Sequence, residues 1–91
     1  MQRLHVRIHG RVQGVGFRWF AREEARRLGL SGWVTNGPGG DVEVEAGGEP
    51  SSLERLRRAL EVGPPGAAVD RLEELADVAS GSLPYPFSIH R

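Results

Sequence analysis

Apolar and polar residues alternate strictly over residues 4–9, near the start of the chain. A period of two residues predicts a strand with one side buried and the other side in water. The buried side would carry Leu4, Val6 and Ile8, and the solvated side His5, Arg7 and His9.

A second alternating segment covers residues 42–46, and Trp33 and Val34 begin another β-forming segment before it. Residues 36–40 between them read Asn-Gly-Pro-Gly-Gly, a composition typical of a turn. Residues 32–47 therefore predict a hairpin. Its outward side would add Glu43 and Glu45 to the solvated face of the sheet.

Helical spacing replaces alternation in two other segments. Over residues 17–28, one face carries Phe17, Phe20, Ala21, Ala25 and Leu28. Gly29 follows where a left-handed C-cap is expected. In the second segment, Leu53, Leu56 and Leu60 form the apolar stripe, and the glycines and prolines of 63–66 end it. Ser51 and Glu54 fit a capping box at its start.

The last third of the chain is less regular. Residues 68–73 are compatible with a strand, but Val69, Leu72 and Leu75 are equally compatible with a helical stripe. Residues 80–84 predict a loop, and Phe87 and Ile89 alternate in a short final strand. The order β-α-β-β-α-β plus a last strand indicates an α+β, ferredoxin-like split βαβ sandwich. We expect an antiparallel sheet of four to five strands with two helices on one face, in a single domain over residues 1–91.

The amino-acid composition excludes several classes of function. The chain has no cysteine, which excludes disulfides and thiolate catalysis, and all 12 of its basic residues are arginine, which excludes a Walker-type lysine. The 12 acidic residues bring the net charge to zero, whereas nucleic-acid binders usually carry a basic excess. We find no signal peptide and no apolar run near the roughly 18 residues of a membrane span. We expect a cytoplasmic monomer without a nucleic-acid or membrane partner.

The loop at residues 10–16 carries the strongest chemical signal, because it holds three glycines and joins a strand to a helix N-terminus. Backbone amides of such a loop can converge on an anion, and the unpaired first-turn amides of the helix add positive charge. Arg18 could then grip two phosphate oxygens with its guanidinium. The residues alone leave two alternatives open: a tight connection without a ligand, and Arg18 as an ordinary solvated helix residue.

Other candidates are weaker. His5 and His9 lie two residues apart on the outward side of the first strand, but no third metal ligand is evident, so we expect no metal and no cofactor. The aromatic residues around Gly16 faintly resemble an RNA-binding signature, yet they fall on a helix rather than on a sheet strand. Asn36 precedes a glycine, and Asn-Gly by itself indicates a hairpin turn.

Two separated motifs make the chain resemble the acylphosphatase family. Residues 10–18, Gly-Arg-Val-Gln-Gly-Val-Gly-Phe-Arg, are similar to the signature loop of that family. Residues 32–36, Gly-Trp-Val-Thr-Asn, match its second motif, and Gly40, Val42 and Gly48 follow at the expected spacing. The resemblance extends from about residue 4 to the C-terminus. It departs at Thr35, where the family usually has a basic residue, and at the chain end, where an aromatic residue is common.

The resemblance implies a hydrolase that cleaves acyl phosphates to a carboxylate and inorganic phosphate, the latter acting as product and inhibitor. Arg18 would bind the phosphate and Asn36 would position the attacking water. The loop amides would hold the phosphoryl oxygens, with contributions from Val12, Gln13, Gly14, Val15, Gly16, Phe17 and Arg18. The alternative from a different class is a non-catalytic module that binds an anion or RNA on the same fold.

Overall fold

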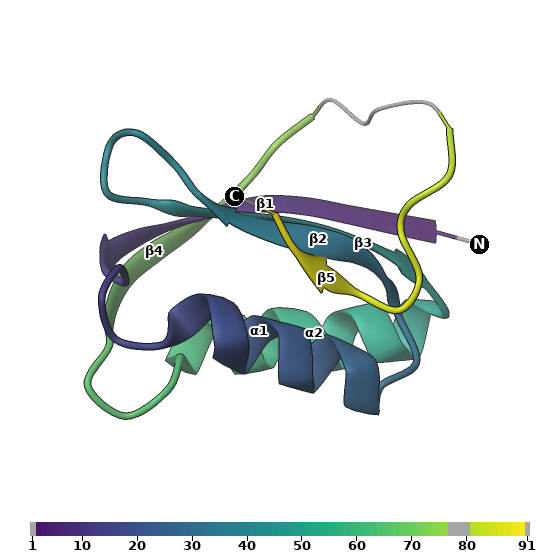
Figure 1. Cartoon of the computed structure of the whole chain (residues 1–91), viewed down its shortest axis with the longest axis horizontal. Helices are drawn as coiled ribbons and strands as arrows, with labels where there is room; N and C mark the ends of the chain where they lie inside the picture. The colour runs from purple at the N-terminus through teal and green to yellow at the C-terminus, as the bar shows by residue number, and fades with distance from the viewer. Residues whose placement is uncertain (1, 77–80, 91) are drawn as a thin grey trace.

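Five strands form one sheet, and both helices cover the same face of it (Figure 1). The computed structural model describes residues 2–76 and 81–90. The elements are β1 (Gln2–Arg11), α1 (Phe17–Arg27), β2 (Ser31–Asn36), β3 (Val42–Gly48), α2 (Pro50–Val62), β4 (Ala68–Glu74) and β5 (Ser88–Ile89). The strand order is β4-β1-β3-β2-β5.

This arrangement confirms the predicted ferredoxin-like split βαβ plan, with one difference at the edge. The pairs β1–β3, β1–β4 and β2–β3 are antiparallel, but β5 runs parallel to β2. The sheet is therefore mixed rather than antiparallel throughout. The cause is topological: β4 ends at the end of the sheet where β2 begins, so a strand that enters there afterwards runs in the same direction as β2.

The core lies between the sheet and the two helices, as the alternation and the helical stripes predict. Val6, Val44 and Val34 are cross-strand neighbours on three adjacent strands, and all three are fully buried. The buried hydrophobic residues are Val6, Ile8, Val12, Phe17, Ala21, Ala25, Leu30, Val34, Val42, Val44, Ala46, Leu53, Leu56, Leu60 and Phe87. The burial of Val12 and Phe17 anchors the two ends of the glycine-rich loop in this core.

The second helix begins earlier than predicted, and the capping box is wrong. Pro50 occupies the first turn and Glu49 is the N-cap residue, without a side-chain capping bond. The Leu53 amide donates to the Glu49 carbonyl at 3.0 Å, which closes the first turn ahead of Ser51. Proline favours this position because its fixed φ suits the helix and its missing N–H would be unpaired there.

The ambiguous tail forms a strand, so the helical alternative for residues 68–74 is wrong. β4 pairs with β1 from Arg11↔Ala68 to Val6↔Glu74, and Val69 and Leu72 pack against the core. Pairing at the sheet edge satisfies the backbone N–H and C=O groups of this segment. The spacing of apolar residues in the sequence does not show whether such a partner strand is present. Within the predicted loop at 80–84, Ser80 lies outside the described residues, and residues 81–84 are irregular.

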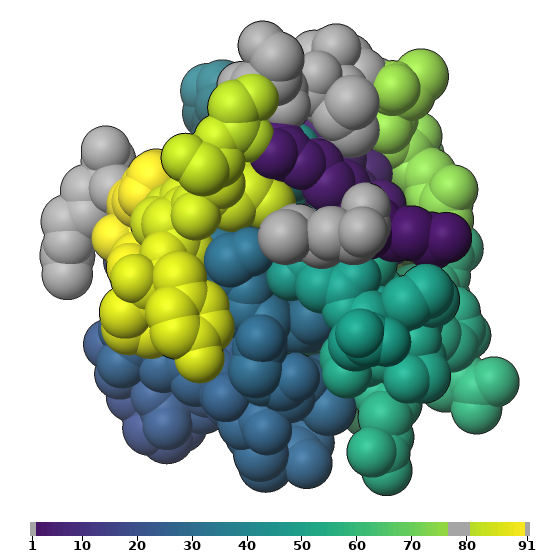
Figure 2. Space-filling model, turned by 90° about the vertical axis from the view of Figure 1, so that its right-hand side faces the viewer, coloured from purple at the N-terminus to yellow at the C-terminus, as the bar shows by residue number. Residues whose placement is uncertain are grey.

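The segment before β5 closes one side of the molecule. The Gly32 amide donates to the Pro84 carbonyl and the Arg26 Nε donates to the Phe87 carbonyl, each at 2.8 Å. Figure 2 shows this segment in yellow against the blue of α1 and the start of β2. These contacts hold β5 beside β2, on the side of the sheet next to α1.

The outer face of the sheet is less exposed than alternation predicts. Glu45 is only 1% exposed, and its Oε2 lies 3.4 Å from the Arg3 Nη1. The expectation of a solvated Glu45 is wrong because β3 is central, with His5 and Trp33 opposite Glu45 on the flanking strands. His5 and Trp33 also contact each other edge to face at 5.9 Å.

Gly32 positions the start of β2, and we expect Gly32→Ala to lower the free energy of unfolding by about 3 kcal/mol. Its φ is 138°, and a β-carbon there would lie 2.0 Å from the Glu45 carbonyl oxygen. Gly29→Ala is the matched control, because Gly29 has a φ of 72° and open space around the added atom. Its cost should be about 1 kcal/mol. Urea unfolding measures both; equal losses would contradict the steric argument.

Candidate functional site

The loop between β1 and α1 is irregular but firmly attached at both ends. Val12 is 1% exposed and Phe17 is 1% exposed, so both side chains belong to the core. Gly14 and Gly16 have φ values of 76° and 77°, in the left-handed region that glycine adopts readily. A β-carbon on either glycine would meet no atom within 4 Å, so the space in front of the loop is open.

Gln13 ties this loop to the hairpin that follows β2. Its Nε2 donates to the Gly37 carbonyl at 2.9 Å and to the Asp41 carbonyl at 2.8 Å. The hairpin turn itself is closed by the Gly37 amide donating to the Asp41 carbonyl at 2.8 Å. One side chain therefore sets the distance between the loop and the end of β2, where Asn36 lies.

Asn36 is the last residue of β2 rather than a turn residue. It pairs with Val42 on β3, and no described residue other than glycine has a positive φ. The left-handed conformation that Asn-Gly adopts in a tight hairpin turn is therefore not used at this position. The turn begins one residue later than the sequence predicts, at Gly37, which leaves the Asn36 side chain fixed by a paired strand.

The N-terminus of α1 faces the same region. Gly16 is its N-cap in the left-handed conformation, and no side chain caps the first turn or places an acidic group there. The Phe20 amide donates to the Gly16 carbonyl at 3.0 Å, so the helix is regular from its first turn. Its first amides retain the partial positive charge of a helix N-terminus.

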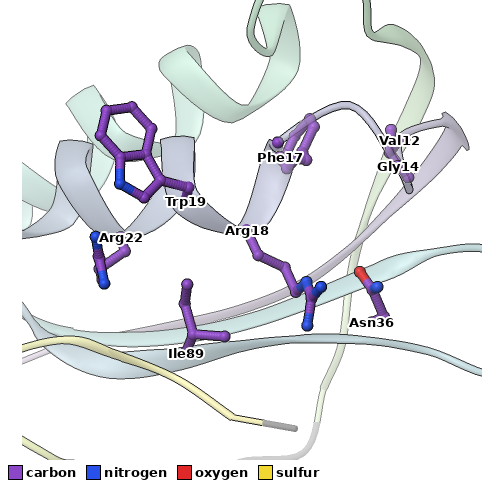
Figure 3. Close-up of a pocket in the computed structure, with 9 residues that line it drawn as sticks. Val12, Gly14, Phe17, Arg18, Trp19, Arg22, Asn36 and Ile89 are labelled. Atoms are coloured by element: carbon purple, nitrogen blue, oxygen red, sulfur yellow. The ribbon is translucent and has the colours of Figure 1, made fainter.

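These elements surround one cavity of about 350 Å³, in which Arg18 and Asn36 meet (Figure 3). Arg18 reaches from the first turn of α1 toward Asn36 on β2. Both residues are half-buried, and neither side chain makes a hydrogen bond or an ion pair with any residue that the structure describes. A cation and an amide thus share a cavity with their polar groups uncommitted.

Most of the predicted site residues line this cavity. The lining residues are Val12, Gly14, Gly16, Phe17, Arg18, Trp19, Arg22, Asn36 and Ile89. Gln13 and Val15 do not line it: Gln13 spans to the hairpin turn, and Val15 packs against the core. Gln13 and Val15 could therefore contribute to the site only through their backbone amides.

Sequence reasoning missed Trp19, Arg22 and Ile89 as lining residues. Arg22 follows Arg18 by four positions, and this spacing places two residues on the same helix face, so a signal was present. Ile89 had no local signal, because it arrives from β5 at the far end of the chain.

The two histidines of β1 lie away from this cavity, each beside a carboxylate. The His5 Nε2 is 2.6 Å from the Glu43 Oε2, and the His9 Nε2 is 2.9 Å from the Glu73 Oε1. The hydrogen bond with His9 lowers the pKa of Glu73 below its usual value.

Neither of the helices in the described ranges has the length and apolar character that a membrane crossing requires.

Comparisons with known proteins agree with the motifs. A family model described as Acylphosphatase matches residues 4–83. The Acylphosphatase of Thermococcus kodakarensis is 54% identical over 71 residues, covering 78% of each chain. That of Anaeromyxobacter sp. (strain Fw109-5) is 45% identical over 89 residues, covering 98% of this chain and 95% of its own. The crystal structure of acylphosphatase from Bacillus subtilis matches with a TM-score of 0.86, 34% identity and 100% coverage of both chains.

Proposed function

The chain belongs to the acylphosphatase family, and from this premise we propose that Arg18 and Asn36 hydrolyse acyl phosphates in the cavity beside the glycine-rich loop. The observation that carries the proposal is the meeting of these two uncommitted side chains at the open side of the loop. The relatives are named for an enzyme, so the non-catalytic anion- or RNA-binding alternative is not favoured.

The phosphoryl group would bind between the loop and Arg18. Converging backbone amides and a helix N-terminus are suited to phosphate oxygens, and the guanidinium donates two parallel hydrogen bonds to such oxygens. Both ionisable residues that line the cavity, Arg18 and Arg22, are arginines. The cavity is therefore positively charged within a chain of zero net charge, which favours a multiply charged anion.

The chemistry of the leaving group explains why so few groups suffice. Attack of water on phosphorus forms one P–O bond and breaks the bond to the acyl oxygen, releasing a carboxylate. The conjugate acid of that carboxylate has a pKa of about 4, so the group leaves without a general acid. The transition state is loose, with charge spread over the phosphoryl oxygens. Positioning and charge stabilisation by Arg18 and the loop amides do most of the work.

Asn36 would orient the water. Its side chain offers a carbonyl oxygen that accepts a hydrogen bond and an amide that donates one, so it can hold water in a defined direction. Strand pairing with Val42 and the Gln13 clamp limit the movement of this side chain relative to the loop. The proton of the water passes to a phosphoryl oxygen, which becomes part of the released phosphate.

We expect hydrolysis of benzoyl phosphate without added metal and with undiminished rate in excess chelator, because no step of the mechanism uses a metal. Inorganic phosphate should inhibit competitively, since it occupies the phosphoryl site. A phosphate monoester such as phenyl phosphate should be hydrolysed at least about 10³-fold more slowly, because its leaving group is far more basic. Steady-state kinetics measure all three; comparable rates for the ester would contradict the mechanism.

We also propose that the protein works in the cytoplasm as a monomer, with all site residues supplied by one chain. The support is that the β1–α1 loop, α1, β2 and β5 of a single chain supply the residues that line the cavity. Specific activity should be independent of protein concentration over the range in which gel filtration reports one species. A loss of specific activity on dilution would show that a second copy is needed.

A further inference from the structure

The cavity that holds Arg18 and Asn36 is larger than a phosphoryl group requires. Its volume of about 350 Å³ corresponds to roughly twelve water molecules at about 30 Å³ each. Its further lining consists of Trp19, Arg22 and Ile89, none of which the hydrolytic mechanism uses. We propose that these three residues bind the acyl group and that Arg22 selects acyl phosphates carrying a second anionic group, such as a carboxylate. This inference rests on the proposed function.

In-line attack decides on which side the acyl group lies. The attacking water and the leaving oxygen take opposite sides of the phosphorus atom. Figure 3 shows Asn36 on one side of the Arg18 guanidinium, with Ile89 and Arg22 on the other side. If Asn36 holds the water, the acyl group leaves toward Ile89 and Arg22.

Arg22 lies one helical turn from Arg18, where it could contact a second anionic group on the acyl part of the substrate. It is four residues after Arg18 on α1, which separates the two positions by about 6 Å along the helix axis. Figure 3 shows both side chains leaving the helix on the same side. The Arg22 side chain is 28% exposed, against 64% for Arg27 on the same helix, so Arg22 is held in the cavity wall.

The guanidinium of Arg22 can take up an anion. Its Nε lies 3.1 Å from the Glu23 Oε2, but Glu23 is 45% exposed, and such surface ion pairs contribute little. The terminal nitrogens of Arg22 have no protein partner among the residues at 2–76 and 81–90. Their planar arrangement suits a carboxylate, and Glu23, the carboxylate beside Arg22, is not among the residues that line the cavity.

Trp19 and Ile89 complete the site with apolar surface. Trp19 is 58% exposed, so much of its indole surface is available to a ligand. Ile89 is half-buried and enters from β5, which α1 and β2 both contact. A carbon chain or ring between the phosphoryl group and the second charge would lie against these two side chains. They hold any acyl group, whereas Arg22 distinguishes a charged end from a neutral one.

The test compares 4-carboxybenzoyl phosphate with 4-methylbenzoyl phosphate. A rigid ring holds the carboxylate away from the acyl carbon, so the carboxylate cannot displace phosphate within the molecule. The measured quantity is the ratio of kcat/KM for the two compounds. Comparing this ratio between variants cancels the intrinsic difference in their reactivity. Wild type, Arg22→Met, Arg22→Lys and Arg27→Met are measured at low ionic strength.

Arg22→Met should lower the ratio about tenfold, as expected for the loss of one charge-assisted contact. The loss should appear in KM for the carboxylated compound with kcat unchanged, because Arg22 contacts the distal charge equally in the ground and transition states. Arg22→Lys should keep the ratio within about threefold of wild type. Arg27→Met removes the same charge from an exposed position on α1 and should leave the ratio at the wild-type value.

Each other outcome has a distinct meaning. Hydrolysis of both compounds with the same ratio in wild type and Arg22→Met would overturn this inference and leave the proposed function standing. An equal fall in Arg27→Met would overturn the assignment to Arg22 in favour of the general charge of the helix. Failure of the wild-type protein to hydrolyse either compound would overturn the proposed function and this inference with it.

Discussion

Arg18→Ala should lower kcat/KM for benzoyl phosphate by about three to four orders of magnitude. In the proposed mechanism the guanidinium binds the phosphoryl oxygens in the ground state and stabilises the charge on them in the transition state, so KM should rise and kcat should fall. Arginines that perform this task in other phosphoryl-transfer enzymes contribute about 10³- to 10⁵-fold. Steady-state kinetics with benzoyl phosphate, and the inhibition constant of inorganic phosphate, measure the two parts separately.

Two further variants identify the cause of this loss. Arg18→Lys keeps the charge but loses the planar pair of donors, so its activity should lie between those of wild type and Arg18→Ala. Arg27→Ala removes an arginine from the exposed last turn of the same helix, and its activity should stay within about twofold of wild type. If Arg18→Ala kept a tenth of the activity or more, Arg18 would not be the phosphoryl-binding residue.

Asn36→Ala should lower kcat by about 10²- to 10³-fold while the inhibition constant of phosphate stays within about twofold. The reason is that, in the proposed mechanism, Asn36 orients the water and leaves the binding of the phosphoryl group to Arg18 and the loop. The free energy of unfolding should change little, because Asn36 pairs through its backbone with Val42 and its side chain has no partner among the described residues.

Thr35→Ala is the matched control for Asn36→Ala. Thr35 is the preceding residue of β2, so its side chain projects from the opposite face of the sheet. It should retain activity within about twofold of wild type, even though the acylphosphatase family usually has a basic residue there. A large loss of stability in Asn36→Ala, with kcat intact, would instead assign Asn36 a structural role at the end of the hairpin.

The N-terminal half of the fold could be predicted because its signals are local and agree with one another. Alternation over residues 4–9 and 42–46 has a period that only a half-buried strand uses, and the stripe from Phe17 to Ala25 has the period of a helix. The glycine-rich loop was recognised for the same reason, whereas the role predicted for Arg18 followed from the family resemblance. The residues of the first motif are consecutive in the sequence. The second motif ends on Asn36, which lines the same cavity.

The start of α2 was predictable but was misjudged. Pro50 and Glu49 are adjacent to Ser51, and the preference of proline for the first turn of a helix competes with the capping-box pattern. In a capping box, Ser51 would have an extended backbone and the helix would begin after it. The helix instead already includes Pro50, so Ser51 lies inside the first turn. The stronger local constraint, on the backbone of Pro50, decided the boundary.

What the sequence by itself determined is the set of elements apart from the strand at residues 68–74, together with the glycine-rich loop, since each depends on neighbours in the chain. The choice of Arg18 and Asn36 for catalysis followed from the family resemblance and stays a proposal. Only the tertiary structure decided that residues 68–74 form a strand, because pairing with β1 supplies the backbone hydrogen bonds. It also decided that Gln13 clamps the hairpin, that Glu45 is buried and that Ile89 reaches the cavity. These contacts join residues 24 or more positions apart or depend on strand order, and no local pattern encodes either.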